Sequence, residues 1–139
     1  RSEILIRMAC QKDPPQAQSV CDAGAILQAR QVAKSIYVDE KIQDYVLDIV
    51  CSTRNPELYS IPIEDLLEFG ASPRASLALI EIARAKALLE NRAFVTPHDV
   101  KSIAPLVLRH RLRRSFEAEA EELSSDTIIQ RIFDALPVP

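Results

Sequence analysis

The apolar residues of this 139-residue chain recur at intervals of three and four positions, and no segment alternates apolar and polar residues over a convincing length. Such spacing places apolar side chains on one face of an α-helix, whereas alternation is the mark of a half-buried strand. The clearest stripe follows Asp39, a good helix N-cap, and consists of Ile42, Tyr45, Val46, Ile49 and Val50. The sequence therefore predicts an all-α fold.

Breakers such as the Pro14-Pro15 pair divide the chain into further helices. A short helix is expected at residues 2–10, and a longer one within 19–36, whose buried face would hold Ile26, Ala29, Ala33 and Ile36. Residues 74–90 are apolar on nearly every side, which predicts the central helix of the bundle. Two more helices are expected after Thr96 and after Ser124 or Ser125, giving a small helical bundle of about five helices.

The composition fits packed helices and excludes some classes of partner. Apolar residues make up 47% of the chain but aromatic ones only 5%, so the core must be built mainly from Ala, Leu, Ile and Val. The net charge of -3 argues against wholesale attraction to nucleic acid or to an anionic membrane, and any polyanion site must be local.

No stretch approaches the length of an apolar membrane span, and the N-terminus does not resemble a signal peptide. The three cysteines, Cys10, Cys21 and Cys51, lack metal-like spacing, which indicates ordinary reduced thiols in an intracellular protein. The chain begins at Arg1 rather than Met, so we expect it to be a fragment of a longer protein.

The sequence lacks the motifs of a complete enzyme. Its only glycines, Gly24 and Gly70, lie too far apart for a phosphate-binding P-loop or a dinucleotide fingerprint. The two histidines, His98 and His110, have no neighbouring nucleophile, and no group of residues has the spacing of metal ligands.

The segment Gly70-Ala71-Ser72-Pro73-Arg74 is the most informative one for function. Gly70 would permit a tight turn, Ser72 would cap the helix at residues 74–90, and Pro73 would take its first position. A helix N-terminus attracts anions, so Arg74 is electrostatically misplaced there unless an external phosphate binds its guanidinium. Alternatively, Arg74 is solvated or paired with a nearby carboxylate, namely that of Glu64, Asp65 or Glu68.

Two further segments each have more than one possible role. The apolar residues within 55–69 either cover the bundle or contact another subunit or a client. The basic cluster of residues 109–114 fits intramolecular or intersubunit pairing, a nucleic-acid surface, or a direct nucleotide role of Arg109 or Arg111. The glutamates within 117–123 would offset the field of the cluster.

The order of these segments resembles the C-terminal helical lid of MoxR-type AAA+ ATPases. The match rests on GASPRASLALIEIARAKALL, FVTPHDVKSIAPLVLRHRL, the EAEAE segment and the terminal PVP, and it covers residues 70–139 closely. The segment IYVDEKIQDYVLDIVCSTR, within residues 19–54, is similar to the two preceding lid helices.

The resemblance implies a division into residues 1–18, a lead-in from an absent ATPase core, and residues 19–139, the lid. It identifies Arg74 as the sensor-2 arginine, which reaches toward the nucleotide phosphates, with Ser72 and Pro73 positioning the helix N-terminus. The cofactor would be Mg-ATP, held mainly by the core, and the Walker motifs would lie upstream. The fragment alone is therefore not expected to hydrolyse ATP, whereas the parent protein is.

Further expectations concern partners and location. The resemblance implies contact with the protein's own N-terminal AAA+ core, a homo-oligomeric ring with a chaperone-like role, von Willebrand factor A-type partners, no nucleic acid and a cytoplasmic location. The competing hypotheses are a standalone helical adaptor that binds proteins through residues 55–69, and a helical nucleic-acid module that uses residues 109–114.

Overall fold

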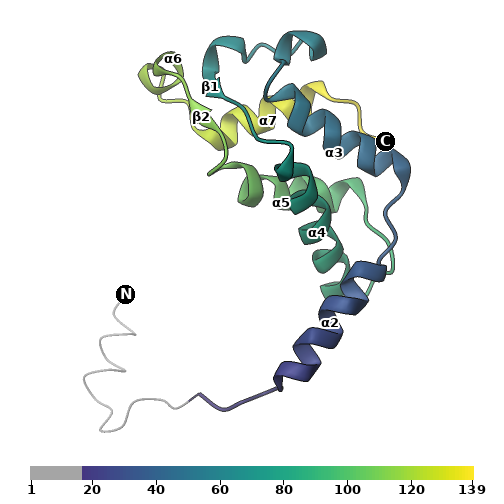
Figure 1. Cartoon of the computed structure of the whole chain (residues 1–139). Helices are drawn as coiled ribbons and strands as arrows, with labels where there is room; N and C mark the ends of the chain where they lie inside the picture. The colour runs from purple at the N-terminus through teal and green to yellow at the C-terminus, as the bar shows by residue number, and fades with distance from the viewer. Residues whose placement is uncertain (1–16) are drawn as a thin grey trace, which may run out of the picture.

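The computed structural model describes residues 17–139, so the helix expected at residues 2–10 lies outside the described part. Within residues 17–139 the chain forms six α-helices, in agreement with the predicted all-α bundle (Figure 1). The helices are α2 Ala23–Ser35, α3 Glu40–Ser52, α4 Arg74–Leu89, α5 Pro97–Leu108, α6 Phe116–Ala120 and α7 Ser125–Ala135. The shorter elements are the 3₁₀ turns η1 Pro56–Tyr59 and η2 Glu64–Leu66 and the strands β1 Leu67–Phe69 and β2 Arg113–Arg114.

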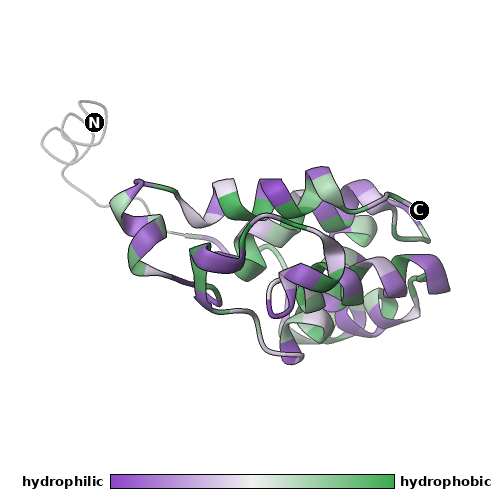
Figure 2. Cartoon of the chain, turned by 90° about the horizontal axis from the view of Figure 1, so that it is seen from above, coloured by the Kyte–Doolittle hydropathy of each residue, from purple (hydrophilic) through white to green (hydrophobic). Residues whose placement is uncertain are grey.

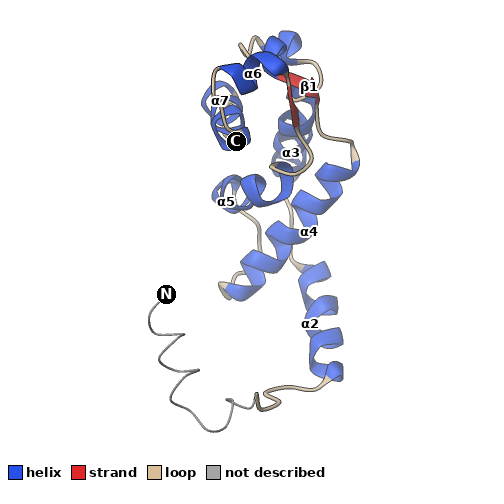
Figure 3. Ribbon diagram, turned by 90° about the vertical axis from the view of Figure 1, so that its left-hand side faces the viewer, coloured by secondary structure: helices blue, strands red, loops and turns tan. Residues whose placement is uncertain are grey.

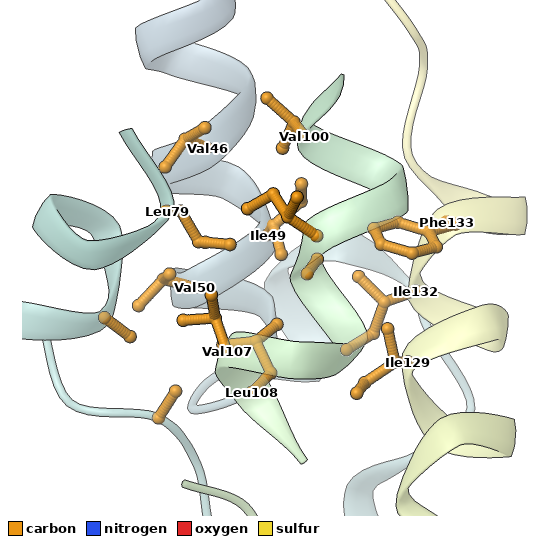
Figure 4. Packing of buried hydrophobic residues seen from close by; sticks show 14 of the residues in the cluster. Val46, Ile49, Val50, Leu79, Val100, Val107, Leu108, Ile129, Ile132 and Phe133 are labelled. Atoms are coloured by element: carbon orange, nitrogen blue, oxygen red, sulfur yellow. The ribbon is translucent and has the colours of Figure 1, made fainter. Parts of the chain in front are cut away.

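The core lies where α3, α4, α5 and α7 meet. Apolar and polar stretches alternate along these helices, as amphipathic helices require (Figure 2). Figure 4 shows Ile49 of α3 and Leu79 of α4 close to Val107 of α5, with Ile132 and Phe133 of α7 packed from the other side. Each buried aliphatic side chain of this size contributes about 1.5–3 kcal/mol through removal from water. The predicted apolar stripe of α3 is thus confirmed, and α5 and α7 each bury a stripe of the same kind.

Helix α4 packs against α2, α3 and α5, in agreement with its expected central place. Its buried face consists mostly of alanines, together with Leu79, and this lets neighbouring backbones approach closely. The helix ends before Asn91, which adopts a left-handed conformation with φ of 55°. Helix α5 then begins after Thr96, as expected, with a capping box in which the Thr96 and Asp99 side chains each accept from the backbone N–H of the other residue.

Helix α2 differs from its prediction. It begins after Asp22, whose side chain caps it, and none of its side chains is buried. Ile26 is 50% exposed and Ala29 is also exposed, so the expected buried face was wrong for these two residues, whereas Ala33 is half-buried and Ile36, just after the helix, is buried. The physical reason is that α2 projects from the bundle and touches it chiefly along α4, as Figures 1 and 3 show.

Residues 55–69 are more ordered than a loop. After η1 and η2 the chain enters β1, which pairs with β2 in a short antiparallel ladder that the sequence pattern does not predict. Ile61, Ile63 and Leu66 are buried in the common core, whereas Leu58 is 77% exposed. Most of the apolar residues in this segment therefore cover the bundle, which confirms the first of the two predicted roles.

Candidate functional site

Arg74 is the first residue of α4, and its side chain is exposed. The hydroxyl of Ser72 accepts a hydrogen bond from the Arg74 backbone N–H at 3.2 Å, and the Ser72 carbonyl accepts from Ala75 at 2.8 Å. Pro73 already has helical backbone angles, although the α-helix is assigned from the next residue. Ser72, Pro73 and Arg74 thus lie together at this helix start, which agrees with the placement predicted from the sequence.

The reason for a glycine at position 70 differs from the expected one. Gly70 does not have a positive φ, so a left-handed turn does not require it. A Cβ at this position would lie 2.1 Å from the Thr53 carbonyl oxygen and 2.8 Å from Cγ of Arg54. Glycine is therefore required because the chain passes directly against the end of α3.

A buried hydrogen bond fixes this close approach. The hydroxyl of Thr53 donates to the Val50 carbonyl at 2.7 Å and accepts from the backbone N–H of Ala71 at 2.9 Å. Thr53 and Ala71 are both buried. The loop that leads into Arg74 is thereby fastened to the C-terminal end of α3, which limits the positions that Arg74 can take.

The guanidinium of Arg74 has no ion pair within residues 17–139, so none of the three carboxylates expected as partners binds it. Glu68 is instead paired with Arg113 at 2.7 Å, and no ion pair of Glu64 or Asp65 occurs in the described chain. Intramolecular pairing of Arg74 with one of these carboxylates is therefore absent from this structure. Its exposure fits either a solvated guanidinium or one that binds an external phosphate.

The structure also brings Arg54 to this place, which the sequence pattern does not predict. An open pocket of about 400 Å³ beside the helix start is lined by Arg54 and by residues 68–73. Arg54 is exposed, and no ion pair involves it within the described residues. The approach of Arg54 to Gly70 depends on how α3 and α4 pack, so no local spacing in the sequence signals it.

The opposite end of α4 is held by a buried carboxylate. Asp99, at the start of α5, accepts two hydrogen bonds from Arg92 at 2.6 and 2.7 Å and two more from Thr96 at 2.8 and 2.9 Å. Burial alone would raise the pKa of Asp99, but the hydrogen bonds from Arg92 and Thr96 and the charge of Arg92 outweigh it and lower the pKa to about 2. Helix α4 is thus fastened at both ends.

The basic cluster of residues 109–114 is largely paired within the chain. Arg109 binds both oxygens of Asp126, at 2.8 and 2.7 Å. Arg113 pairs with Glu68, and Arg114 lies 3.6 Å from Glu119. The prediction of intramolecular pairing is confirmed for these three arginines, and neither Arg109 nor Arg111 lines the pocket beside Arg74.

The remaining candidate residues, the histidines, cysteines and carboxylates, do not form a metal centre within residues 17–139. Among residues 17–139 no three His, Cys, Asp or Glu side chains are arranged to hold a metal ion, and no helix is long and apolar enough to span a membrane. His98 and His110 are both exposed. Cys21 and Cys51 are exposed free thiols, and Cys10 lies outside the described residues.

Comparison with known proteins agrees with this fold. The family model of the AAA lid domain matches residues 63–132. Chaperone MoxR1 of Mycobacterium tuberculosis is 38% identical over 99% of this chain and 36% of its own length. Protein MoxR of Methylorubrum extorquens is 29% identical over 80% of this chain and 34% of its own length.

A solved structure matches the fold closely. The crystal structure of a candidate ATPase from Cytophaga hutchinsonii superimposes with a TM-score of 0.91 at 30% identity, over 99% of this chain and 42% of that one. The present chain spans about a third of the length of the two MoxR proteins. Together with the bundle and its helix start at Arg74, these matches show that the chain belongs to the AAA lid domain family and is homologous to the C-terminal part of MoxR-type AAA ATPases.

Proposed function

We propose that this chain covers the nucleotide bound by a separate AAA core and that Arg74 acts as the sensor-2 arginine. A lid domain implies association with such a core. In this proposal the core holds Mg-ATP, because the present sequence contains no P-loop, and the lid brings a cation to the terminal phosphates. The complete protein is an ATP hydrolase, and this chain contributes to its activity without containing the reaction centre.

The observation that carries the proposal is the exposed guanidinium of Arg74 at a braced helix start. In the described chain it has no carboxylate partner, and it lies where the unpaired N–H groups of α4 also favour an anion. A phosphate group fits this arrangement, since a guanidinium donates to phosphate oxygens in a forked geometry. Ser72 and Pro73 position the helix start rather than bind the nucleotide.

The bracing of α4 supports a coupling role. Thr53 fastens the loop before its N-terminus, and Asp99 fastens the segment after its C-terminus. We infer that loss of the terminal phosphate releases Arg74 and moves the lid as one body relative to the core. The chaperone-like role in a homo-oligomeric ring, with von Willebrand factor A-type partners, rests on similarity to MoxR proteins, one of which is described as a chaperone.

The experiment is steady-state ATP hydrolysis by the complete ATPase that carries this lid. Arg74→Ala is expected to lower turnover at least tenfold, because removal of a charge-assisted contact to the transferred phosphate costs about 1.5–3 kcal/mol. Arg109→Ala is the control, since it removes an exposed arginine whose partner is Asp126. If Arg74→Ala and wild type hydrolyse ATP at the same rate, with unchanged helicity, Arg74 is not the sensor-2 arginine.

A further inference from the structure

Helix α2 is a helix without a buried side chain. It has 13 residues, and an isolated helix of that length is marginal in water. It packs along α4, and just beyond its C-terminal end Tyr37 exchanges backbone hydrogen bonds with Ala93 and Val95 at 2.9 and 3.0 Å. Arg84 of α4 adds a hydrogen bond to the Ile36 carbonyl at 3.1 Å. Within the described residues α2 is therefore held by α4 and by the segment after its C-terminal end, but none of its side chains is buried.

Helix α2 exposes three large apolar side chains, and one of them, Leu27, borders a groove. Leu27 is 59% exposed, and Ile26 and Val32 are also exposed. Between α2 and α4 runs a groove of about 780 Å³, lined in part by Leu27, Arg30 and Lys34. In Figures 1 and 3, α2 extends away from α6 and α7, so the groove lies at the end of the molecule remote from them.

The groove is cationic although the chain as a whole is acidic. Arg30, Lys34 and Arg84 line it together with a single carboxylate, that of Glu81. The net charge of the chain is -3. Arg84 is held by Ile36, whereas Arg30 and Lys34 have no ion pair within residues 17–139. A surface that fits this groove therefore combines apolar side chains with carboxylates.

We infer that α2 and the α2–α4 groove form the surface on which the AAA core of the same protein docks, through an apolar patch bordered by acidic side chains. This inference rests on the proposed function, because it assigns a face of the lid to the core contact. The chain spans only 36% of MoxR1, a relative that aligns over 99% of this chain, α2 included. The remaining length of such a protein is large enough to supply the cover that α2 lacks among residues 17–139.

The first experiment compares amide hydrogen exchange of residues 23–35 in this 139-residue chain and in the complete ATPase. Exchange in the chain alone is expected to be fast, since no buried side chain of α2 opposes local opening. In the complete protein the same amides are expected to exchange at least about tenfold more slowly. Equal exchange rates in the two samples would overturn the inference.

Matched variants of the complete protein locate the contact. Leu27→Glu is expected to return the exchange of residues 23–35 to the rate in the chain alone. Leu106→Glu is the control, because Leu106 of α5 is similarly exposed at 64% and lies outside the groove. For charge, Lys34→Glu is expected to accelerate exchange, whereas Lys41→Glu, on the exposed side of α3, is not. If neither Leu27→Glu nor Lys34→Glu changes the amide exchange of residues 23–35, docking of the core on this groove is contradicted.

Exchange of α2 in the isolated chain also distinguishes docking on the core from cover by a second copy. Slow exchange that depends on the concentration of the isolated chain would show that a second copy covers this face, and would overturn the assignment to the core. Slow exchange at every concentration would show that the chain itself covers α2, with the same consequence. If Arg74→Ala lowers turnover while Leu27→Glu leaves exchange unchanged, the proposed function stands and only the docking surface is wrong.

Discussion

Gly70 lies so close to Thr53 that no other residue fits between the two segments. A Cβ at position 70 would be 2.1 Å from the Thr53 carbonyl oxygen, which is backbone and cannot swing aside. The neighbouring hydrogen bond from the Ala71 amide to the Thr53 hydroxyl, at 2.9 Å, depends on the same approach. The position of Arg74 relative to α3 is therefore set by the absence of a side chain four residues earlier.

Gly70→Ala is expected to destabilise the fold by roughly 1–3 kcal/mol, the usual cost of forcing extra atoms into a packed site. The free energy of unfolding from denaturant titration measures this effect. Gly24→Ala is the control, because its added Cβ would meet nothing closer than Asp22 at 3.4 Å, an ordinary contact. Similar stabilities of the two variants would show that the loop moves away from α3 without cost.

The buried carboxylate of Asp99 predicts a pH dependence of stability. Its pKa of about 2 in the folded chain is below the ordinary value of 3.8, so the ionised form stabilises the fold above about pH 4. That contribution is lost as the pH falls through the folded pKa of about 2. Asp99→Asn is expected to cost about 1.5–3 kcal/mol at neutral pH and to flatten the stability profile between pH 4 and pH 2.

Asp126→Asn serves as the comparison for Asp99. Arg109 also lowers the pKa of Asp126, but the side chains of this pair are about half exposed. Solvent screening therefore leaves such a pair with only a small contribution to the free energy of unfolding. A loss of stability as large as that of Asp99→Asn would mean that burial does not govern the strength of these pairs.

Loss of the hydroxyl at two tyrosines of the bundle should change the stability of the fold in opposite directions. The Tyr45 hydroxyl is buried and has no hydrogen-bond partner among the described residues, whereas Tyr59 donates to Asp48 at 3.0 Å. Tyr45→Phe is expected to be neutral or to stabilise the chain by up to about 1 kcal/mol, and Tyr59→Phe to destabilise it by about 1 kcal/mol. Thermal unfolding of both variants tests the prediction. A clear destabilisation by Tyr45→Phe would reveal a partner for its hydroxyl.

Much of the fold could be predicted because three helices carry both a periodic apolar face and a cap. Asp39, Thr96 and Ser124 each accept from the backbone at the start of a helix, and the stripes that follow them are buried. These signals are local, and tertiary contacts reinforce them. Helix α2 has similar periodicity but lies at the edge of the bundle, where most of its apolar side chains stay exposed, so burial could not be inferred from spacing alone.

The features that could not be predicted depend on contacts between distant segments. Strands β1 and β2 are too short to show alternation and form only because residues 67–69 meet residues 113–114. Helix α6 has five residues, and its sequence indicates only a polar stretch. At the candidate site, Arg74 and its cap could be located from local signals, whereas Arg54 reaches Gly70 through the packing of α3.

The pairing of the basic cluster predicts weak binding to nucleic acid. Arg109, Arg113 and Arg114 each have a carboxylate partner, so few cations of this cluster are available for phosphate contacts. A mobility-shift titration of the chain with duplex DNA at low salt is expected to give no tight complex. Tight binding that weakens steeply with added salt would instead favour a nucleic-acid module.

The most direct test of the sensor-2 role compares the binding of ATP and AMP by the complete ATPase with Arg74 or Ala at position 74. If Arg74 contacts the terminal phosphates, Arg74→Ala should weaken ATP binding by about tenfold or more, the equivalent of about 1.4 kcal/mol, and leave AMP binding unchanged. Equal affinities of both proteins for ATP, or an equal loss for ATP and AMP, would contradict the contact between Arg74 and the nucleotide's terminal phosphates.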